Sequence, residues 1–100
     1  MKGTWFWPEE PKAQARVLRT VRGDEHLPII LAALAKSKDG LSNAQIDNML
    51  ANNSQWRTLW HLRQLTALGF VEYEVEIFGD AGKYMLTELG KTVLPTITGQ

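Results

Sequence analysis

The side chains with the richest recognition chemistry lie in one short segment near the middle of the chain. Arginine pairs with the two major-groove acceptors of guanine, glutamine pairs with adenine, and hydroxyl or guanidinium groups bind phosphate oxygens. Arg57 and Gln64 carry the donors for base contacts. Ser54 and Arg63 suit phosphate contacts, and Gln55 stands next to Ser54. The alternative interpretation is a surface helix whose polar residues are simply solvated.

The same segment carries aromatic rings but no carboxylates. No Asp or Glu occurs from residue 48 through 71, so the region is locally basic in a chain of zero formal net charge. Trp56 and Trp60 are one helical turn apart, and His61 flanks them. Exposed tryptophans are unfavourable for a monomer and are enriched in interface hot spots. They either stack on sugars and thymine methyl groups or pack on the N-terminal segment or a partner protein, and we expect packing for at least one.

Two further groups of charged side chains lie outside this segment. A basic stripe runs along one side of the helical pattern at residues 11–22: Lys12, Arg16, Arg19 and Arg22. The stripe either contacts phosphates or is a solvated face. A predicted hairpin has Lys83 near its tip, and three carboxylates alternate along its first strand: Glu72, Glu74 and Glu76. These carboxylates would repel phosphates, so we expect them on an outer face turned away from DNA; a metal site there would lack partner ligands.

Side chains suited to catalysis are scarce. The chain has no cysteine, which excludes disulfides, thiolate zinc sites and cysteine nucleophiles. His26 and His61 fall in different predicted helices, each without an evident acid or nucleophile partner. No phosphate-binding glycine loop, nucleophile elbow or metal-spacing pattern is present. We therefore expect neither an enzyme nor a bound cofactor or metal.

Helices must position these residues, and apolar periodicity predicts three of them before residue 52. The first ends at Gly23 and turns four side chains inward: Ala13, Val17, Leu18 and Val21. Asp24 caps the second, whose first turn tolerates Pro28. Ser42 and Gln45 form a capping box for the short third helix, whose predicted inward face is Ile46, Met49 and Leu50.

A fourth helix, a hairpin and a fifth helix follow. Ser54 caps the fourth helix and Gly69 stops it, with a predicted buried stripe of Leu59, Leu62, Leu65 and Thr66 and with Leu68 near its end. Alternation after Phe70 predicts a half-buried strand with an inward face of Tyr73, Val75 and Ile77. Residues 79–82 turn the chain into a returning strand at 83–86. Thr87 caps the last helix, which Pro95 helps to end.

Three stretches of this pattern resemble the winged helix-turn-helix domains of prokaryotic regulators, of the broad MarR, ArsR and PadR kind. Residues 41–46, LSNAQI, resemble the start of the first motif helix. Residues 54–71 resemble the recognition helix running into the wing, and residues 84–91, YMLTELGK, resemble the strand-to-helix segment after the wing. The resemblance implies an α+β, mostly α fold: a three-helix core, a β-hairpin wing and extra N-terminal and C-terminal helices.

The resemblance also implies a function. We expect double-stranded DNA binding by a transcriptional regulator that reads the major groove with the helix of about residues 54–68, acting as a homodimer on a palindrome-like site. The expected organisation is an aromatic arm and amphipathic helix at 1–23, the winged helix-turn-helix domain at 24–94 and a tail at 95–100. The alternative is a protein-interaction module without a DNA role, using Trp56, Trp60 and the N-terminal aromatic residues Trp5, Phe6 and Trp7.

A membrane partner is not expected. The longest apolar run, residues 27–35, is far shorter than the about 20 residues that a bilayer span needs. No signal peptide is recognisable at the N-terminus, so we expect a cytoplasmic protein.

Overall fold

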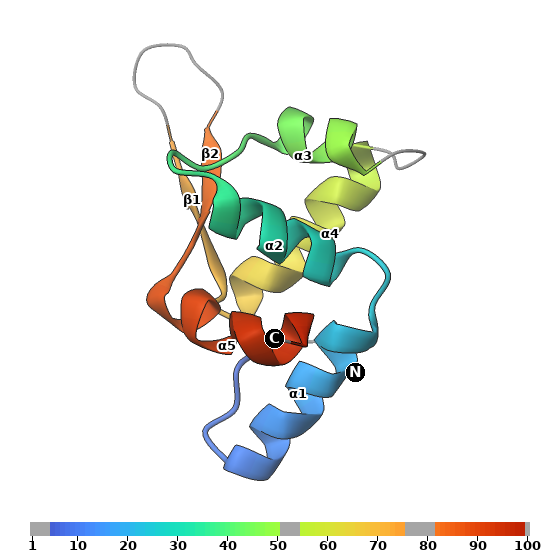
Figure 1. The fold of residues 1–100 in the computed structure, drawn as a ribbon, viewed down its shortest axis with the longest axis vertical. Helices are drawn as coiled ribbons and strands as arrows, with labels where there is room; N and C mark the ends of the chain where they lie inside the picture. Colours follow the sequence, from blue (N-terminus) through green and yellow to red (C-terminus); the bar gives the residue numbers. More distant parts are fainter. Residues whose placement is uncertain (1–4, 51–54, 76–81, 100) are drawn as a thin grey trace.

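A computed structural model describes residues 5–50, 55–75 and 82–99 of the 100-residue chain. It contains five helices and one antiparallel hairpin among these residues (Figure 1). The elements in chain order are α1 (Pro11–Gly23), α2 (Leu27–Lys36), α3 (Asn43–Met49), α4 (Gln55–Ala67), β1 (Val71–Glu74), β2 (Lys83–Leu86) and α5 (Glu88–Thr98). None of the helices in the described part of the chain is long and apolar enough to cross a membrane.

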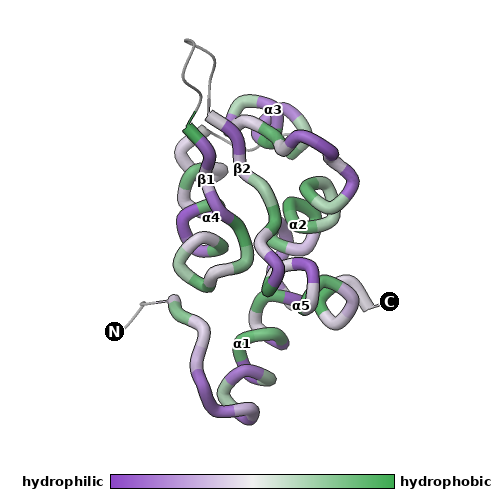
Figure 2. The backbone as a smooth tube through the Cα atoms, turned by 90° about the vertical axis from the view of Figure 1, so that its left-hand side faces the viewer, coloured by the Kyte–Doolittle hydropathy of each residue, from purple (hydrophilic) through white to green (hydrophobic). Residues whose placement is uncertain are grey.

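The amphipathic pattern of α1 is confirmed. Val21 is fully buried, and the side chains of the basic stripe are all exposed. Hydrophobic and hydrophilic turns alternate along this helix in Figure 2. The preceding arm folds back on the body of the protein because Trp7 packs edge-on against Phe70, with ring centroids 5.3 Å apart. The amide of Gln14 donates to the carbonyl of Pro8 at 2.8 Å, which fixes the arm to α1.

The predicted capping box of α3 is present, and Asp24 binds the start of α2 although the residue at the N-cap position of that helix is His26. The carboxylate of Asp24 accepts the backbone N–H groups of His26 and Leu27, each at 2.9 Å, so it satisfies two of the amides that a helix start leaves unpaired. Ser42 and Gln45 bond to each other's backbone N–H as a capping box. Met49 was predicted to face inward together with Ile46 and Leu50, but it is 41% exposed.

Helix α4 buries a different stripe from the predicted one. Leu62 and Leu65 are buried as expected, but Thr66 is exposed and Leu59 is only half-buried. Thr58 takes the inward place instead, because its hydroxyl has a partner on α3. Gly69 ends the helix with a positive φ of 82°. The bonds from Gly69 N–H to Thr66 and from Phe70 N–H to Leu65 form a Schellman motif.

The hairpin pairs β1 with β2 in antiparallel register, with Tyr73 opposite Tyr84. The half-buried strand was a wrong expectation. Val71 is buried, but Tyr73 is 49% and Val75 is 72% exposed, so burial of the predicted inward face is limited to the start of β1 among the described residues. Ile77, the third residue of the predicted inward face, lies outside the described residues. At the base of the hairpin, Leu41 and Tyr84 exchange two backbone hydrogen bonds of 3.1 and 2.8 Å.

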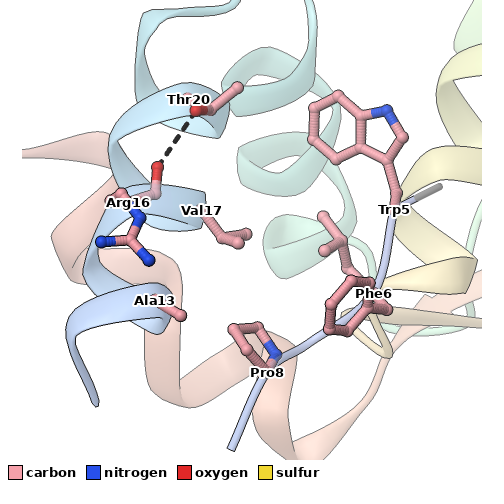
Figure 3. Close-up of a pocket in the computed structure, with 8 residues that line it drawn as sticks. Trp5, Phe6, Pro8, Ala13, Arg16, Val17 and Thr20 are labelled. Carbon is pink, nitrogen blue, oxygen red and sulfur yellow. Dashed lines mark hydrogen bonds between the residues drawn. The ribbon is translucent and has the colours of Figure 1, made fainter. Parts of the chain in front are cut away.

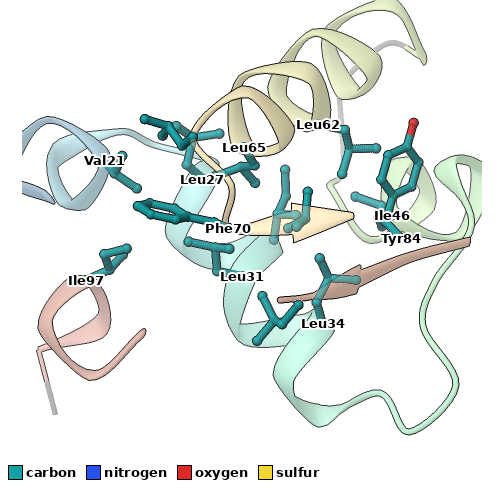
Figure 4. Close-up of a cluster of buried hydrophobic side chains, with 14 of the residues drawn as sticks. Val21, Leu27, Leu31, Leu34, Ile46, Leu62, Leu65, Phe70, Tyr84 and Ile97 are labelled. Atoms are coloured by element: carbon teal, nitrogen blue, oxygen red, sulfur yellow. The ribbon is translucent and has the colours of Figure 1, made fainter. Parts of the chain in front are cut away.

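Helix α5 closes the other side of the core. Thr87 caps it as predicted, accepting the Gly90 N–H at 3.0 Å. Pro95 does not end the helix, which continues to Thr98. Ile97, only 2% exposed, gains burial from this extra turn, and Gly99 closes the helix in the left-handed conformation. The core lies where α1, α2, α4 and α5 converge on Phe70, and it extends along the hairpin to Tyr84 (Figure 4).

Candidate nucleic-acid interface

The free face of α4 presents three large side chains. Trp56 is 76% exposed and Trp60 is 57% exposed, and Arg63 is exposed one turn further on. The three share one stripe because they are spaced by four and three residues. Arg63 belongs to the centre of this face, whereas the sequence placed it on the flank. In the described part of the chain, Arg63 forms no ion pair.

The opposite side of α4 is fixed to α3 by a buried polar contact. Thr58 is fully buried, and its hydroxyl donates to a carboxylate oxygen of Asp47 at 2.7 Å. A hydrogen bond to a charged acceptor is among the stronger side-chain bonds, so it holds the two helices at one angle. The bond also means that the carboxylate nearest to the start of α4 is already engaged inside the protein.

The two side chains predicted to contact bases occupy one shoulder of the free face. Arg57 is exposed, and Gln64 is half-buried. Neither is enclosed in the fold, and the groove-reading hypothesis requires that both side chains be accessible. Gln55 begins α4. Ser54, the predicted cap of this helix and a predicted phosphate contact, lies outside the described residues.

His61 lies on the border between the free face and the core. Its ring stacks on that of His26, with centroids 4.8 Å apart and planes at 26°. Burial, and next the nearby His26, lower the pKa of His61, while Asp24 opposes the change. Gln64 interacts weakly with the ring, but neither ring nitrogen forms a hydrogen bond of good geometry with any described residue. His61 therefore favours its neutral form and serves the junction of α2 and α4 more than the free face.

The hairpin contributes few positive charges. Lys83 is half-buried and stands opposite Glu74 in the register. Glu72 and Glu74 are exposed, whereas Glu76 and the expected tip at Asp80 lie outside the described residues. No three metal-ligating side chains come together within the ranges that the structure describes.

The basic stripe of α1 is not brought together with the free face of α4. Arg16 lines an open hollow of about 300 Å³ between the aromatic arm and α1 (Figure 3), which Leu68, just after α4, also lines. Arg19 lies beside Thr96 of α5. Trp56 and Arg57, in contrast, lie at the first turns of α4, near α3 (Figure 1). Within one chain, Arg16 and Arg19 thus form a separate basic surface.

Sequence reasoning missed two contacts that shape this region. The stacking of His26 on His61 joins the residue that precedes α2 to α4, and no spacing rule links positions so distant in sequence. The inward position of Thr58 could have been predicted from its spacing, because a threonine one turn before Leu62 lies on the buried side of the helix. No feature of the sequence identified Asp47 as its partner.

Comparison with known proteins supports the fold. The sequence matches no known family profile and no curated protein. The structure is similar to that of a possible HxlR family transcriptional factor from Thermoplasma volcanium GSS1, with a TM-score of 0.67, 20% identity, and coverage of 90% of this chain and 77% of that chain. HxlR is not one of the expected MarR, ArsR and PadR groups, so the subfamily stays a prediction. The chain has the predicted α+β, mostly α winged helix-turn-helix fold, with α3 and α4 as the motif helices and β1–β2 as the wing.

Proposed function

We propose that this protein binds double-stranded DNA as a transcriptional regulator and that α4 enters the major groove. The observation that carries the proposal is the free face of α4, which combines exposed Arg63 and Arg57 with a complete lack of carboxylates on the helix. The similarity to a possible transcriptional factor supports it. A helix presented in this way has the diameter and the donors that base-edge recognition requires.

Two carboxylates near α4 are held in place by hydrogen bonds. Asp47 accepts from Thr58, and Asp24 accepts from two backbone N–H groups, so both side chains are held against the fold, although these neutral donors leave their negative charge in place. The exposed carboxylates Glu72 and Glu74 lie on the wing rather than on α4. Binding then depends on a local positive surface in a neutral chain, and we expect affinity to fall steeply as salt rises.

The proposed acting unit is a homodimer. Regulators that place two recognition helices in successive major grooves read palindrome-like sites with half-sites about one helical turn apart. A two-fold pair carries two copies of the basic surface of α1. In the proposed dimer, Arg16 and Arg19 on these surfaces contact phosphates of the duplex. A cytoplasmic location follows from the same proposal.

Fluorescence anisotropy with labelled genomic duplexes at about 100 mM salt tests the function. We expect binding that weakens with salt, and a loss of about 1–3 kcal/mol in Arg63→Ala or Arg57→Ala where the side chain reads a base. Lys91→Ala is the matched control, because Lys91 is an exposed cation on α5 that pairs with Glu88 at 3.4 Å. Binding no stronger than that of an unrelated protein would refute the proposal.

The exposure of Trp56 and Trp60 favours a second candidate, a protein-interaction module without a DNA role. In that case Trp60→Ala reduces the mass of an assembly measured by light scattering and leaves any DNA affinity unchanged. A monomeric mass for wild type and variant alike would contradict self-association through this face.

A further inference from the structure

The two exposed indoles of α4 are not explained by ordinary groove reading. An indole offers a single N–H donor and no acceptor, so it reads few of the patterns that base edges present. Neither ring has an aromatic partner among the described residues. Two large apolar surfaces kept in water on the most prominent face of the helix point to a ligand with flat, apolar faces.

The spacing of Trp56 and Trp60 along the helix comes close to the thickness of one base. Residues four apart on a helix are about 6 Å apart along its axis, with Cβ atoms about 5–6 Å apart on one face. A base held between two aromatic planes needs about 7 Å, which is twice the 3.4 Å step of a DNA strand. The Cβ spacing falls slightly short of this value, so the two side chains must spread as they leave the helix to hold one planar ring between them.

The charges beside the indoles select a nucleic acid as the occupant. Arg57 follows Trp56, Arg63 follows Trp60 by one turn, and no carboxylate lies on the helix. The backbone on either side of an unstacked nucleotide places phosphates next to its base, where these guanidinium groups meet them. An acidic peptide would satisfy the arginines but would supply a planar ring only at an aromatic residue, whereas every nucleotide carries both a planar base and a phosphate.

We propose that Trp56 and Trp60 clasp a single unstacked base, so that the protein prefers duplexes with an unpaired nucleotide over fully paired ones. The inference rests on the proposed DNA-binding function and names a feature of its substrate. Apolar side chains enter base steps in other DNA-binding proteins at the expense of stacking. A nucleotide that is already unpaired removes most of that cost, and the stacking gain of about 1–3 kcal/mol per base then appears as affinity.

The test compares two labelled duplexes of about 25 base pairs, long enough for two half-sites, that differ only by one central unpaired adenine. We expect about tenfold tighter binding of the bulged duplex in anisotropy titrations. Trp56→Ala and Trp60→Ala should bring this ratio close to one, while Trp60→Phe should keep part of it. Phe6→Ala is the matched control, because Phe6 is 60% exposed but belongs to the N-terminal arm.

The outcomes separate this inference from the function on which it rests. Equal binding of both duplexes overturns the base clasp and leaves DNA binding intact. Binding of the bulged duplex alone supports the clasp and overturns recognition of intact double-stranded DNA, whereas no binding of either duplex overturns both. If Trp60→Ala lowers the mass of an assembly in light scattering and the affinity ratio is unchanged, the indoles form a protein interface and the clasp is refuted.

Discussion

Replacing Gly90 with alanine should separate α5 from the start of the wing. A Cβ at this position would lie 2.1 Å from the carbonyl oxygen of Phe70, whereas ordinary contacts begin at 3.4 Å. Backbone carbonyls cannot rotate away as a flexible side chain does, so α5 must move by about 1 Å or more. The same carbonyl accepts the Thr87 N–H at 3.0 Å, and Thr87 caps α5. The movement therefore strains the cap and the burial of Val93 and Ile97.

The size of the effect can be worked out from these contacts. Overpacking costs about 1–3 kcal/mol, and a weakened hydrogen bond adds about 1 kcal/mol. Alanine recovers up to about 1 kcal/mol through its better helix propensity. The net loss in the free energy of unfolding is about 1–3 kcal/mol, which lowers the Tm of a domain of this size by roughly 4–24 °C.

Circular dichroism melting of Gly90→Ala and Gly23→Ala measures the contrast. Gly23 ends α1 without a positive φ, and an added Cβ there meets nothing within 4 Å. Gly23→Ala should therefore keep or slightly raise the Tm, since it removes backbone freedom from the unfolded chain. A Gly90→Ala protein that melts within about 3 °C of wild type would show that α5 does not pack on Phe70 as described.

Two further predictions concern the contacts of α4. Burial lowers the pKa of His61 from 6.5 in the folded protein, so below about pH 6.5 the unfolded chain binds more protons than the folded one. The folded state is therefore fully stable with respect to His61 above about pH 6.5, and it loses stability as the pH falls from there toward the lowered pKa. The urea concentration at the unfolding midpoint should thus decrease when the pH is lowered from about 7.5 to 5.5 in wild type, and decrease less in His61→Phe. An equal decrease in both proteins would contradict the lowered pKa of His61. Thr58→Val removes the 2.7 Å bond to Asp47 and should cost about 1–3 kcal/mol, whereas Thr66→Val, at an exposed position on the same helix, should stay within about 0.5 kcal/mol; similar melting of both variants would refute the role of that bond.

Local signals in the sequence carried most of the fold. The Ser42–Gln45 capping box, the acceptor at Asp24, the stop at Gly69 and the cap at Thr87 depend on neighbouring residues, and all are present. Pro95 was misread because its local cost is outweighed by the burial of Ile97, which sequence position does not reveal. Tyr73 and Val75 were misread because alternation does not show whether a second layer covers the strand.

The candidate site was harder to predict than the elements that carry it. Periodicity identified the side of α4 that bears Trp56 and Arg57, but the exact rotation follows from the burial of Thr58 together with Leu62 and Leu65. This rotation places Arg63 at the centre of the free face and Gln64 on the shoulder. Tertiary contacts of this kind join distant positions, and a single sequence contains no record of them.

The paired hydrogen bonds between Leu41 and Tyr84 have a mechanical consequence. Leu41 directly precedes the capping box of α3, and Tyr84 belongs to the returning strand of the wing. The spacing between the start of α3 and the wing is thus fixed by two backbone hydrogen bonds. Under the proposed DNA-binding function, a duplex in contact with both elements must adjust its own groove width to this spacing, so its stiffness becomes part of what is selected, even at base pairs that no side chain reaches.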